Sequence, residues 1–170
     1  MKTLKTLMAA GLILFSIAAC KKDKDGGDGG NAAEGTIKAK IAGSSWVSMT
    51  ASANFVSTGK ALTMMGVDMG GKTINLIITG YDEKPGTYEI TSGGVAIAVT
   101  ASYVEASVSG SKTWAAPYSG SGAIGEVKIS EFSKTGNVKG TFKFKARNQN
   151  DSNDFKEITD GSFNLKVKSY

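Results

Sequence analysis

The residue types of this 170-residue chain exclude several kinds of catalytic site. The chain has no histidine and a single cysteine, Cys20, so Ser-His-Asp catalysis, Cys-His catalysis and histidine-bearing zinc sites are excluded by composition. Paired carboxylates would suit a glycosidase, but no pair has the spacing and context of such a site. We therefore expect a protein that is not an enzyme and needs no cofactor, with a carboxylate-pair hydrolase as the open alternative. The available carboxylates include Asp82, Glu83, Glu89, Glu105, Glu126 and Glu131.

One stretch matches a phosphate-binding motif. Gly66 to Thr73 has the Walker A spacing, in which backbone amides surround a phosphate and a helix follows the Lys-Thr pair. Residues 74–78 alternate in polarity and are rich in isoleucine, which predicts a strand instead of that helix. We therefore interpret Gly70-Gly71 as a hairpin turn and expect no nucleotide site.

Two features could serve binding. Trp114 and Tyr118 are large aromatics within a glycine- and serine-rich stretch, residues 107–125, and offer stacking faces to a sugar ring or an apolar partner. The alternative is that both rings fold back over an open end of the domain. A later loop is rich in oxygen ligands and is a weak calcium candidate, although it lacks the glycine and terminal glutamate of an EF-hand. The residues of this candidate metal site are Asn150, Asp151 and Asp154.

A basic stripe follows one face of a predicted strand. Its residues alternate with Phe142 and Phe144, which belong to the opposite, core-facing side. A reader of single-stranded nucleic acid would instead need aromatics on the basic face, so we expect no nucleic-acid partner. A solvated sheet face is the simplest interpretation, and weak attraction to an anionic glycolipid or polysaccharide is the alternative. The stripe consists of Lys139, Lys143, Lys145 and Arg147, with Lys166 and Lys168 from a neighbouring strand.

The elements that position these residues are predicted to be short strands, because apolar residues recur with a period of two from Thr36 onward. No segment has a 3.6-residue apolar period long enough for a helix. Turns are expected at Pro85-Gly86, at 135–137 and at Asp160-Gly161, which we interpret as the tip of the last hairpin. The predicted strands cover 37–41, 51–55, 61–67, 74–78, 87–90, 95–103, 127–129, 138–146, 155–159 and 162–167.

This pattern predicts an all-β fold, either an antiparallel β-sandwich or an up-and-down, lipocalin-like barrel of about nine or ten strands. The strand faces with alternating apolar residues must form its core. The residues expected in the core include Val99, Phe142, Phe144, Phe163 and Leu165.

The N-terminus has the plan of a secretory signal. Lys2 and Lys5 precede an apolar run that is too short for a permanent spanning helix and ends in small residues. The sequence Ile-Ala-Ala-Cys at 17–20 resembles the lipobox of bacterial lipoproteins, which implies lipid attachment (diacylglycerol and palmitate-type acyl chains) at Cys20 and removal of residues 1–19. Removing 19 of 170 residues leaves 151, enough for one domain, and lowers the formal charge from +5 to +3. An acylated Cys20 leaves no thiol for redox chemistry.

Residues 20–35 are expected to form the acylated cysteine and a flexible tether, followed by a single β-domain over 36–170. The tether is rich in Gly, Asp and Lys and would reach about 20 Å on average. Acidic and lysine residues after an acylated cysteine resemble the export tags of some Gram-negative surface lipoproteins. An exported protein, anchored in the outer membrane with either a periplasmic or an external face, is the resulting expectation.

Four stretches resemble one protein family. They are Gly-Thr-Phe-Lys-Phe at 140–144, Ile-Thr-Asp-Gly-Ser-Phe-Asn at 158–164, the opening 39–46 and the central Pro-Gly-Thr-Tyr at 85–88. The pattern resembles an uncharacterised family of small Gram-negative bacterial surface lipoproteins, which implies an all-β domain of unknown function and brings no catalytic residues. We expect a non-catalytic binding module for a glycan or another extracellular ligand. The alternative is a structural or protein-interaction lipoprotein of the envelope without a small-molecule ligand.

Overall fold

The computed structural model describes residues 32–93 and 96–170, and all regular structure within these ranges is β-strand. No helix that could cross a membrane occurs in the described part of the chain. The expected signal peptide, Cys20 and most of the expected tether lie outside these residues. The strands are β1 (Thr36–Ile41), β2 (Ser44–Val47), β3 (Thr50–Val56), β4 (Ala61–Val67), β5 (Thr73–Thr79), β6 (Gly86–Ile90), β7 (Ala98–Ser107), β8 (Gly110–Ala116), β9 (Gly125–Phe132), β10 (Asn137–Asn148) and β11 (Phe155–Ser169).

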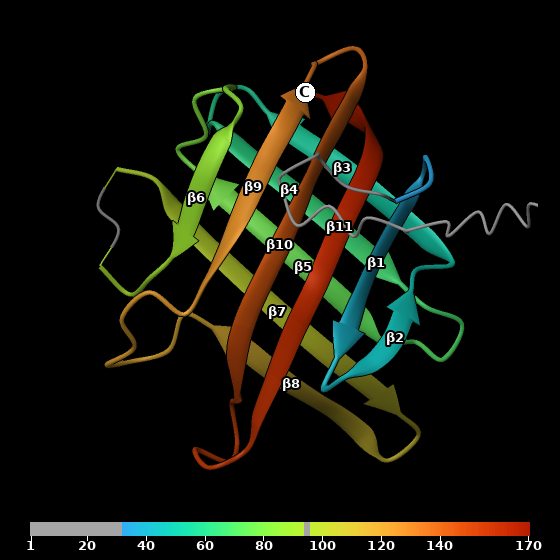
Figure 1. The fold of residues 1–170 in the computed structure, drawn as a ribbon, viewed down its shortest axis with the longest axis vertical. Helices are drawn as coiled ribbons and strands as arrows, with labels where there is room; N and C mark the ends of the chain where they lie inside the picture. Colours follow the sequence, from blue (N-terminus) through green and yellow to red (C-terminus); the bar gives the residue numbers. More distant parts are fainter. Residues whose placement is uncertain (1–31, 94–95) are drawn as a thin grey trace, which may run out of the picture.

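The strands form one sheet in the order β2-β1-β11-β3-β4-β5-β7-β8-β10-β9-β6, and β10 also pairs with β11. That extra pairing closes seven strands into a ring, with β1 and β2 attached beside β11 and with β9 and β6 attached beside β10. In Figure 1 the strands β6, β9, β10, β11, β1 and β2 form a front layer, and β3, β4, β5, β7 and β8 cross behind it. The fold is therefore a flattened, barrel-like sandwich, and the predicted fold class is confirmed.

The two layers join at two corners. Arg147 and Asn148 of β10 pair with Ala115 and Trp114 of β8, and Val167–Ser169 of β11 run parallel to β3. This short parallel pairing departs from the purely antiparallel arrangement that was predicted. It arises because the long strand β11 leaves the front layer and continues along the first strand of the back layer.

The interior is filled by the alternating apolar residues that the period-two pattern predicted. All five residues expected in the core, Val99, Phe142, Phe144, Phe163 and Leu165, are at most 3% exposed. Burying a side chain of this size contributes about 1.5–3 kcal/mol relative to leaving it exposed.

Glycines opposite phenylalanines let the front layer curve tightly. A Cβ atom at Gly161 would lie 2.5 Å from the carbonyl oxygen of Phe142 and 2.6 Å from its ring. A Cβ at Gly140 would likewise lie 2.5 Å from Cζ of Phe163. The absence of a side chain at these positions therefore lets the phenyl rings lie flat across the neighbouring backbone.

The predicted hairpin turn at Asp160-Gly161 is wrong, because residues 155–169 form one strand. Phe142 of β10 pairs with Gly161, and Phe144, two residues later, pairs with Ile158, so β11 has one extra residue between these pairs. The pairing of β11 with β1 shifts at the same place. Asp160 has φ 50°, so it adopts the left-handed conformation of a β-bulge. Asp and Gly favour that conformation in bulges as in tight turns, which explains the error.

Two further strands were not predicted. β8 lies within the glycine- and serine-rich stretch 107–125, and β2 follows the turn at Gly43. β8 pairs with β7 over seven residues, from Ala101–Ala116 to Ser107–Gly110. This pairing with β7 makes the segment a strand, although its local sequence does not predict one.

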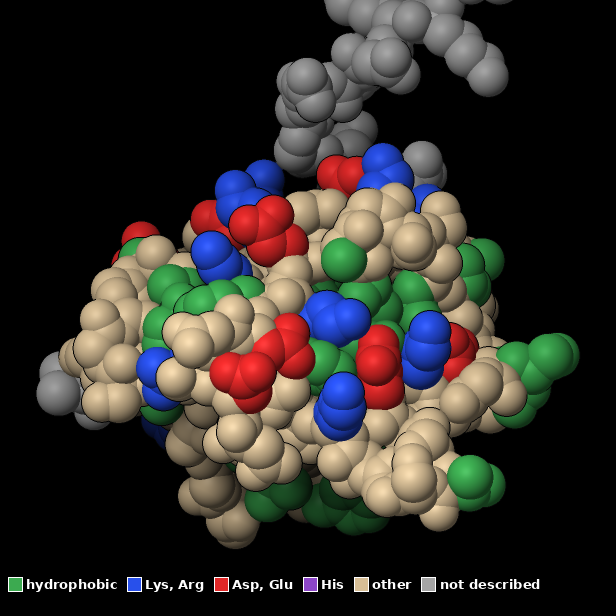
Figure 2. Space-filling view, turned by 90° about the horizontal axis from the view of Figure 1, so that it is seen from below, with side chains coloured by type: hydrophobic (Ala, Val, Ile, Leu, Met, Phe, Trp, Pro, Cys, Tyr) green, Lys and Arg blue, Asp and Glu red, His purple; other side chains and the backbone are tan. Residues whose placement is uncertain are grey.

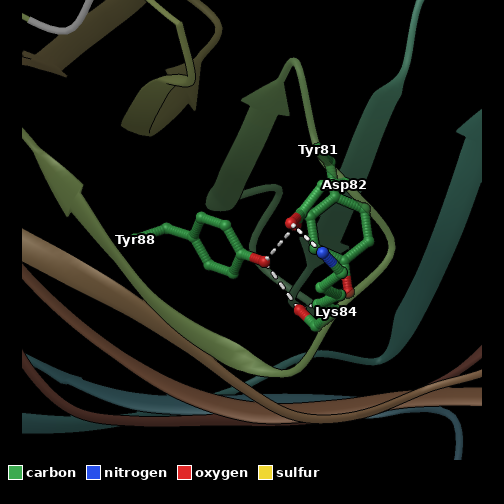
Figure 3. A network of polar contacts seen from close by, with 4 residues as sticks. All are labelled: Tyr81, Asp82, Lys84 and Tyr88. Atoms are coloured by element: carbon green, nitrogen blue, oxygen red, sulfur yellow. Dashed lines mark hydrogen bonds and ion pairs between the residues drawn. The ribbon is translucent and has the colours of Figure 1, made fainter.

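One end of the barrel is closed by aromatic side chains. Phe55, Tyr81, Tyr88 and Phe132 pack edge to face, with ring centroids 5.0–6.2 Å apart. The Tyr88 hydroxyl lies 2.6 Å from the Lys84 carbonyl oxygen and 3.0 Å from Oδ1 of Asp82, so its one proton is shared between two acceptors (Figure 3). We call this end the aromatic end, and the end with the β10–β11 loop the loop end.

Candidate ligand-binding site

Trp114 is not in an irregular loop, and its expected exposure to a ligand is wrong. It lies in β8 and is 2% exposed, with its ring 5.7 Å from that of Tyr103 on β7. Lys156 Nζ sits 4.8 Å above the indole and 3.5 Å from Oε1 of Glu105, which also accepts a 2.9 Å hydrogen bond from the Tyr103 hydroxyl. Trp114 therefore closes the core at the loop end. It has no free stacking face, as the alternative interpretation anticipated.

Charged side chains cover this end of the barrel. Figure 2, seen from the side of the β10–β11 loop, shows Lys and acidic side chains interleaved over its centre, with hydrophobic side chains between them. Lys156 and Glu105 form an ion pair at 3.5 Å beside Trp114, and both side chains are partly buried. Such pairs keep an apolar interior closed without placing isolated charges inside it.

Tyr118 lies just beyond β8 and is half-buried at the corner between β8 and β10. The Cζ atom of Arg147 is 4.6 Å from the Tyr118 ring centroid, within the range of a cation–π contact. The Tyr118 ring also meets Phe155 at a centroid distance of 5.8 Å, and Lys145 Nζ lies 4.9 Å from the Phe155 ring. We name these four residues the cation–aromatic ladder. Strand register explains it, since Arg147 pairs with Phe155 on one side and with Ala115 on the other.

A hollow of about 300 Å³ opens beside this ladder. Its lining comes from the end of β8 and the residues that follow it, from the end of β10, and from the β10–β11 loop. A second hollow of about 240 Å³ on the outer face of β5, β7 and β8 shares Ala115 and Pro117 with it, so the two adjoin. The first hollow is lined by Ala115, Pro117, Tyr118, Arg147, Asn148, Gln149 and Ser152.

The calcium candidate lies in the loop next to this hollow, and its oxygens serve the loop itself. Asp154 Oδ2 accepts a 2.8 Å hydrogen bond from the Asn148 amide, and Asp151 Oδ1 accepts one of 2.9 Å from the backbone N–H of Asn153. Asn150 donates its N–H to the side-chain oxygen of Asn148. Within the described residues, no group of three or more acidic, His or Cys side chains is arranged to hold a metal ion.

The Asn148 amide holds the pKa of Asp154 below its ordinary value, and the Trp114 indole has a second, smaller effect. No acceptor lies within hydrogen-bonding geometry of Trp114 Nε1, so the indole acts on Asp154 as a distant, poorly aligned donor. Asp154 therefore stays ionised while it fastens the loop to the end of β10.

The basic stripe is only partly free of acidic neighbours. Lys139 lies 2.8 Å from Glu131, and Lys143 lies 3.1 Å from Glu126, so acidic residues of the neighbouring strand β9 pair with both lysines. Lys145 and Arg147 have no such partner among the described residues and instead contact the rings of the ladder.

The Walker A match is a hairpin turn, as the following sequence predicted. It joins β4 to β5, and Asp68 Oδ1 accepts hydrogen bonds from the backbone N–H groups of Gly70 and Lys72, both at 2.8 Å. The segment after it is strand β5, which lacks the helix N-terminus that a phosphate-binding loop requires.

Of the two aromatics predicted to bind, the structure places only Tyr118 beside a hollow. Arg147 and Phe155 were not predicted to join it, and Phe155 is 40% exposed. A composition signal could have singled out Arg147, because it is the only arginine in the chain and the other basic residues are all lysines.

Comparison with known proteins identifies a family for this chain. No curated protein and no solved structure matches the chain. A family described as a domain of unknown function, DUF6252, matches residues 33–165, which include all of the first ten strands and most of β11. The chain belongs to this family.

Proposed function

We propose that this protein is a lipid-anchored β-domain of the bacterial envelope or cell surface that binds a glycan or another extracellular ligand without catalysis. One observation carries the proposal, namely the hollow at the β8–β10 corner, where an apolar wall faces polar side chains. Tyr118 and Pro117 form that wall, and Gln149 and Ser152 are among the polar residues. A sugar ring has the same two-sided character, with C–H groups on its faces and hydroxyls at its edge.

The expected affinity of one such site is weak. An aromatic contact contributes about 0.5–1.5 kcal/mol beyond the burial of its area, and association itself costs several kcal/mol. Many copies of the protein held on one surface would raise the effective affinity for a polymer, because each further binding event becomes intramolecular.

The position of the hollow suits a protein anchored through Cys20. β1 runs antiparallel to β11, with Thr36 opposite Asn164 and Ile41 opposite Ile158. The described chain therefore enters toward the aromatic end, whereas the hollow lies near the start of β11 at the loop end. An N-terminal anchor on a flexible tether would therefore let the hollow face away from the membrane.

The second candidate function is a structural or protein-interaction role without a small-molecule ligand. The burial of Trp114 favours it, because that ring was the largest surface expected to contact a ligand. The closure of both barrel ends by side chains favours it as well.

A glycan array probed with the full chain in detergent tests the proposal. We expect binding that Tyr118→Ala weakens, whereas Tyr170→Ala, at a tyrosine that is 72% exposed and far from the hollow, leaves it unchanged. An array without a bound glycan would favour the structural role, and binding that both variants retain equally would remove the assignment of the site to this hollow.

A further inference from the structure

Arg147 is set apart from the other basic residues of the sheet. It is the only arginine in the chain, lies on the outer face of β10 and lines the hollow. Its side chain is partly buried, yet within the described residues it makes no ion pair and donates no hydrogen bond. Lys139 and Lys143 on the same strand each have an acidic partner. The structure thus holds one guanidinium in place without using its N–H groups.

Contact with Tyr118 orients this guanidinium. The Cζ atom lies 4.6 Å from the ring centroid, and a cation held over a ring leaves its N–H donors at the edge of the guanidinium plane available. Two parallel N–H groups on such an edge match the two oxygens of a carboxylate. Ordering the side chain beforehand reduces the entropy that a ligand must overcome.

The carboxylates of the neighbouring loop do not accept hydrogen bonds from the N–H groups of Arg147. Asp154 accepts from Asn148 at the end of β10, and Asp151 accepts from Asn153, so the two nearby carboxylates of the loop already have hydrogen-bond partners. Neither lines the hollow, whose other polar side chains are the neutral Asn148, Gln149 and Ser152. Lys145, which contacts Phe155 on the next rung of the ladder, adds a second positive charge to this corner.

We propose that the ligand of this site is an acidic sugar whose carboxylate binds Arg147, a uronic-acid type of residue within a polysaccharide. This inference rests on the proposed function and specifies its ligand. The apolar wall of Tyr118 and Pro117 takes the sugar ring, and the guanidinium takes the carboxylate through two hydrogen bonds. The planar pair of N–H groups fits the two coplanar oxygens of a carboxylate, and Lys145 adds a favourable longer-range attraction for an anion.

The test is an array that prints uronic-acid polysaccharides beside their carboxyl-reduced counterparts, together with neutral, sulfated and phosphorylated glycans, probed with the full chain in detergent. We expect the carboxylated members to bind and their reduced counterparts to lose about tenfold or more in affinity, as for the loss of a charge-assisted hydrogen-bonded pair. Arg147→Lys keeps the charge but not the fork, and should lose a similar factor. Lys166→Gln removes one charge from the same sheet face near the aromatic end and should change little.

The outcomes separate this inference from the function on which it rests. Neutral glycans that bind and are lost with Tyr118→Ala would overturn the carboxylate assignment and leave the binding function standing. Binding confined to sulfated or phosphorylated members, or equal binding by Arg147→Lys and the unmodified chain, would overturn it as well. An array without any bound glycan would overturn both. The comparison of uronic-acid polysaccharides with their carboxyl-reduced counterparts uses the unmodified chain, so its result does not depend on whether a variant folds.

Discussion

Trp114 and Tyr118 lie four residues apart and have opposite environments. Trp114 is 2% exposed and packs on Tyr103, whereas Tyr118 lies half-buried at the corner. Trp114→Ala should therefore lower the free energy of unfolding by about 3–5 kcal/mol, the usual cost of deleting a buried aromatic. Tyr118→Ala should lower it by only about 1 kcal/mol, the value of a cation–π contact near the surface.

Urea unfolding of the two variants, followed by fluorescence or circular dichroism, measures this difference. Equal losses would mean that Tyr118 is part of the core and that its role in binding has no support. The comparison also indicates which substitution can be used in a binding assay, because a destabilised protein loses binding for trivial reasons.

Tyr88 and Tyr81 give the domain a sensitivity to alkaline pH. Burial, with the Asp82 carboxylate adding to it, raises the pKa of Tyr88 from 10.0 to about 12, and burial raises that of Tyr81 as well. Between pH 10 and 12 the folded state keeps protons that the unfolded state releases, so stability that is present below pH 10 is lost as the pH rises.

Tyr88→Phe should make the loss of stability between pH 10 and 12 shallower without abolishing it, because burial also raises the pKa of Tyr81 and of Tyr103. The same substitution removes the hydroxyl that is the main cause of the lowered pKa of Asp82, so that pKa should rise toward its ordinary value. Unfolding curves across this pH range and an NMR titration of Asp82 measure the two effects. An unchanged pH profile would mean that the hydroxyl remains hydrated.

Among the elements, the strands with clear alternation were predictable and those defined by long-range pairing were not. β10 alternates from Val138 to Ala146 and was predicted correctly. β8 consists of Gly, Ser, Lys, Thr, Trp and Ala without alternation, and it is a strand because β7 lies beside it. The site shares this limit. Tyr118 was noted for its residue type, but Arg147 meets it only through the β8–β10 corner, which no local pattern encodes.

The bulge in β11 is a second feature that long-range pairing, and not local sequence, determines. Asp160-Gly161 has residue types that suit both a hairpin turn and a bulge, and only partners on both sides of β11 decide between them. Local sequence therefore predicts the backbone conformation here but not the topology.

The glycines that face phenyl rings should be the least tolerant positions in the front layer. Gly161→Ala and Gly140→Ala should each cost about 1–3 kcal/mol or more, because the new methyl group must displace a ring and a backbone carbonyl. Gly122→Ala is the matched control, since no atom lies within 4 Å of a Cβ at that position. Thermal unfolding of the three variants measures the ranking, and a melting temperature of Gly161→Ala equal to that of Gly122→Ala would contradict it.

In the molecule as a whole, closure of the sheet explains how a chain rich in small residues holds the residues of a surface site in a fixed geometry. The hollow lies at a corner where β8 meets β10, and the second corner fixes β11 against β3. Residues far apart in sequence, such as Tyr118 and Arg147, keep their mutual position because both layers are tied at both corners. A site on a closed sheet is thus more rigid than one on a free loop.

The proposed lipid anchor at Cys20 also concerns the whole molecule, because it would tether the domain to a membrane and so bear on which way the site can face. Cys20→Ser should release the protein from the membrane fraction, since attachment would depend on acyl chains that each contribute about 0.8 kcal/mol per buried CH₂. Lys24→Ser is the matched control, because it changes a residue four positions away without removing the cysteine. Fractionation of cells after a high-salt wash measures the distribution. A Cys20→Ser protein that stays with the membranes would contradict the anchor, and it would also remove the argument that the hollow faces outward.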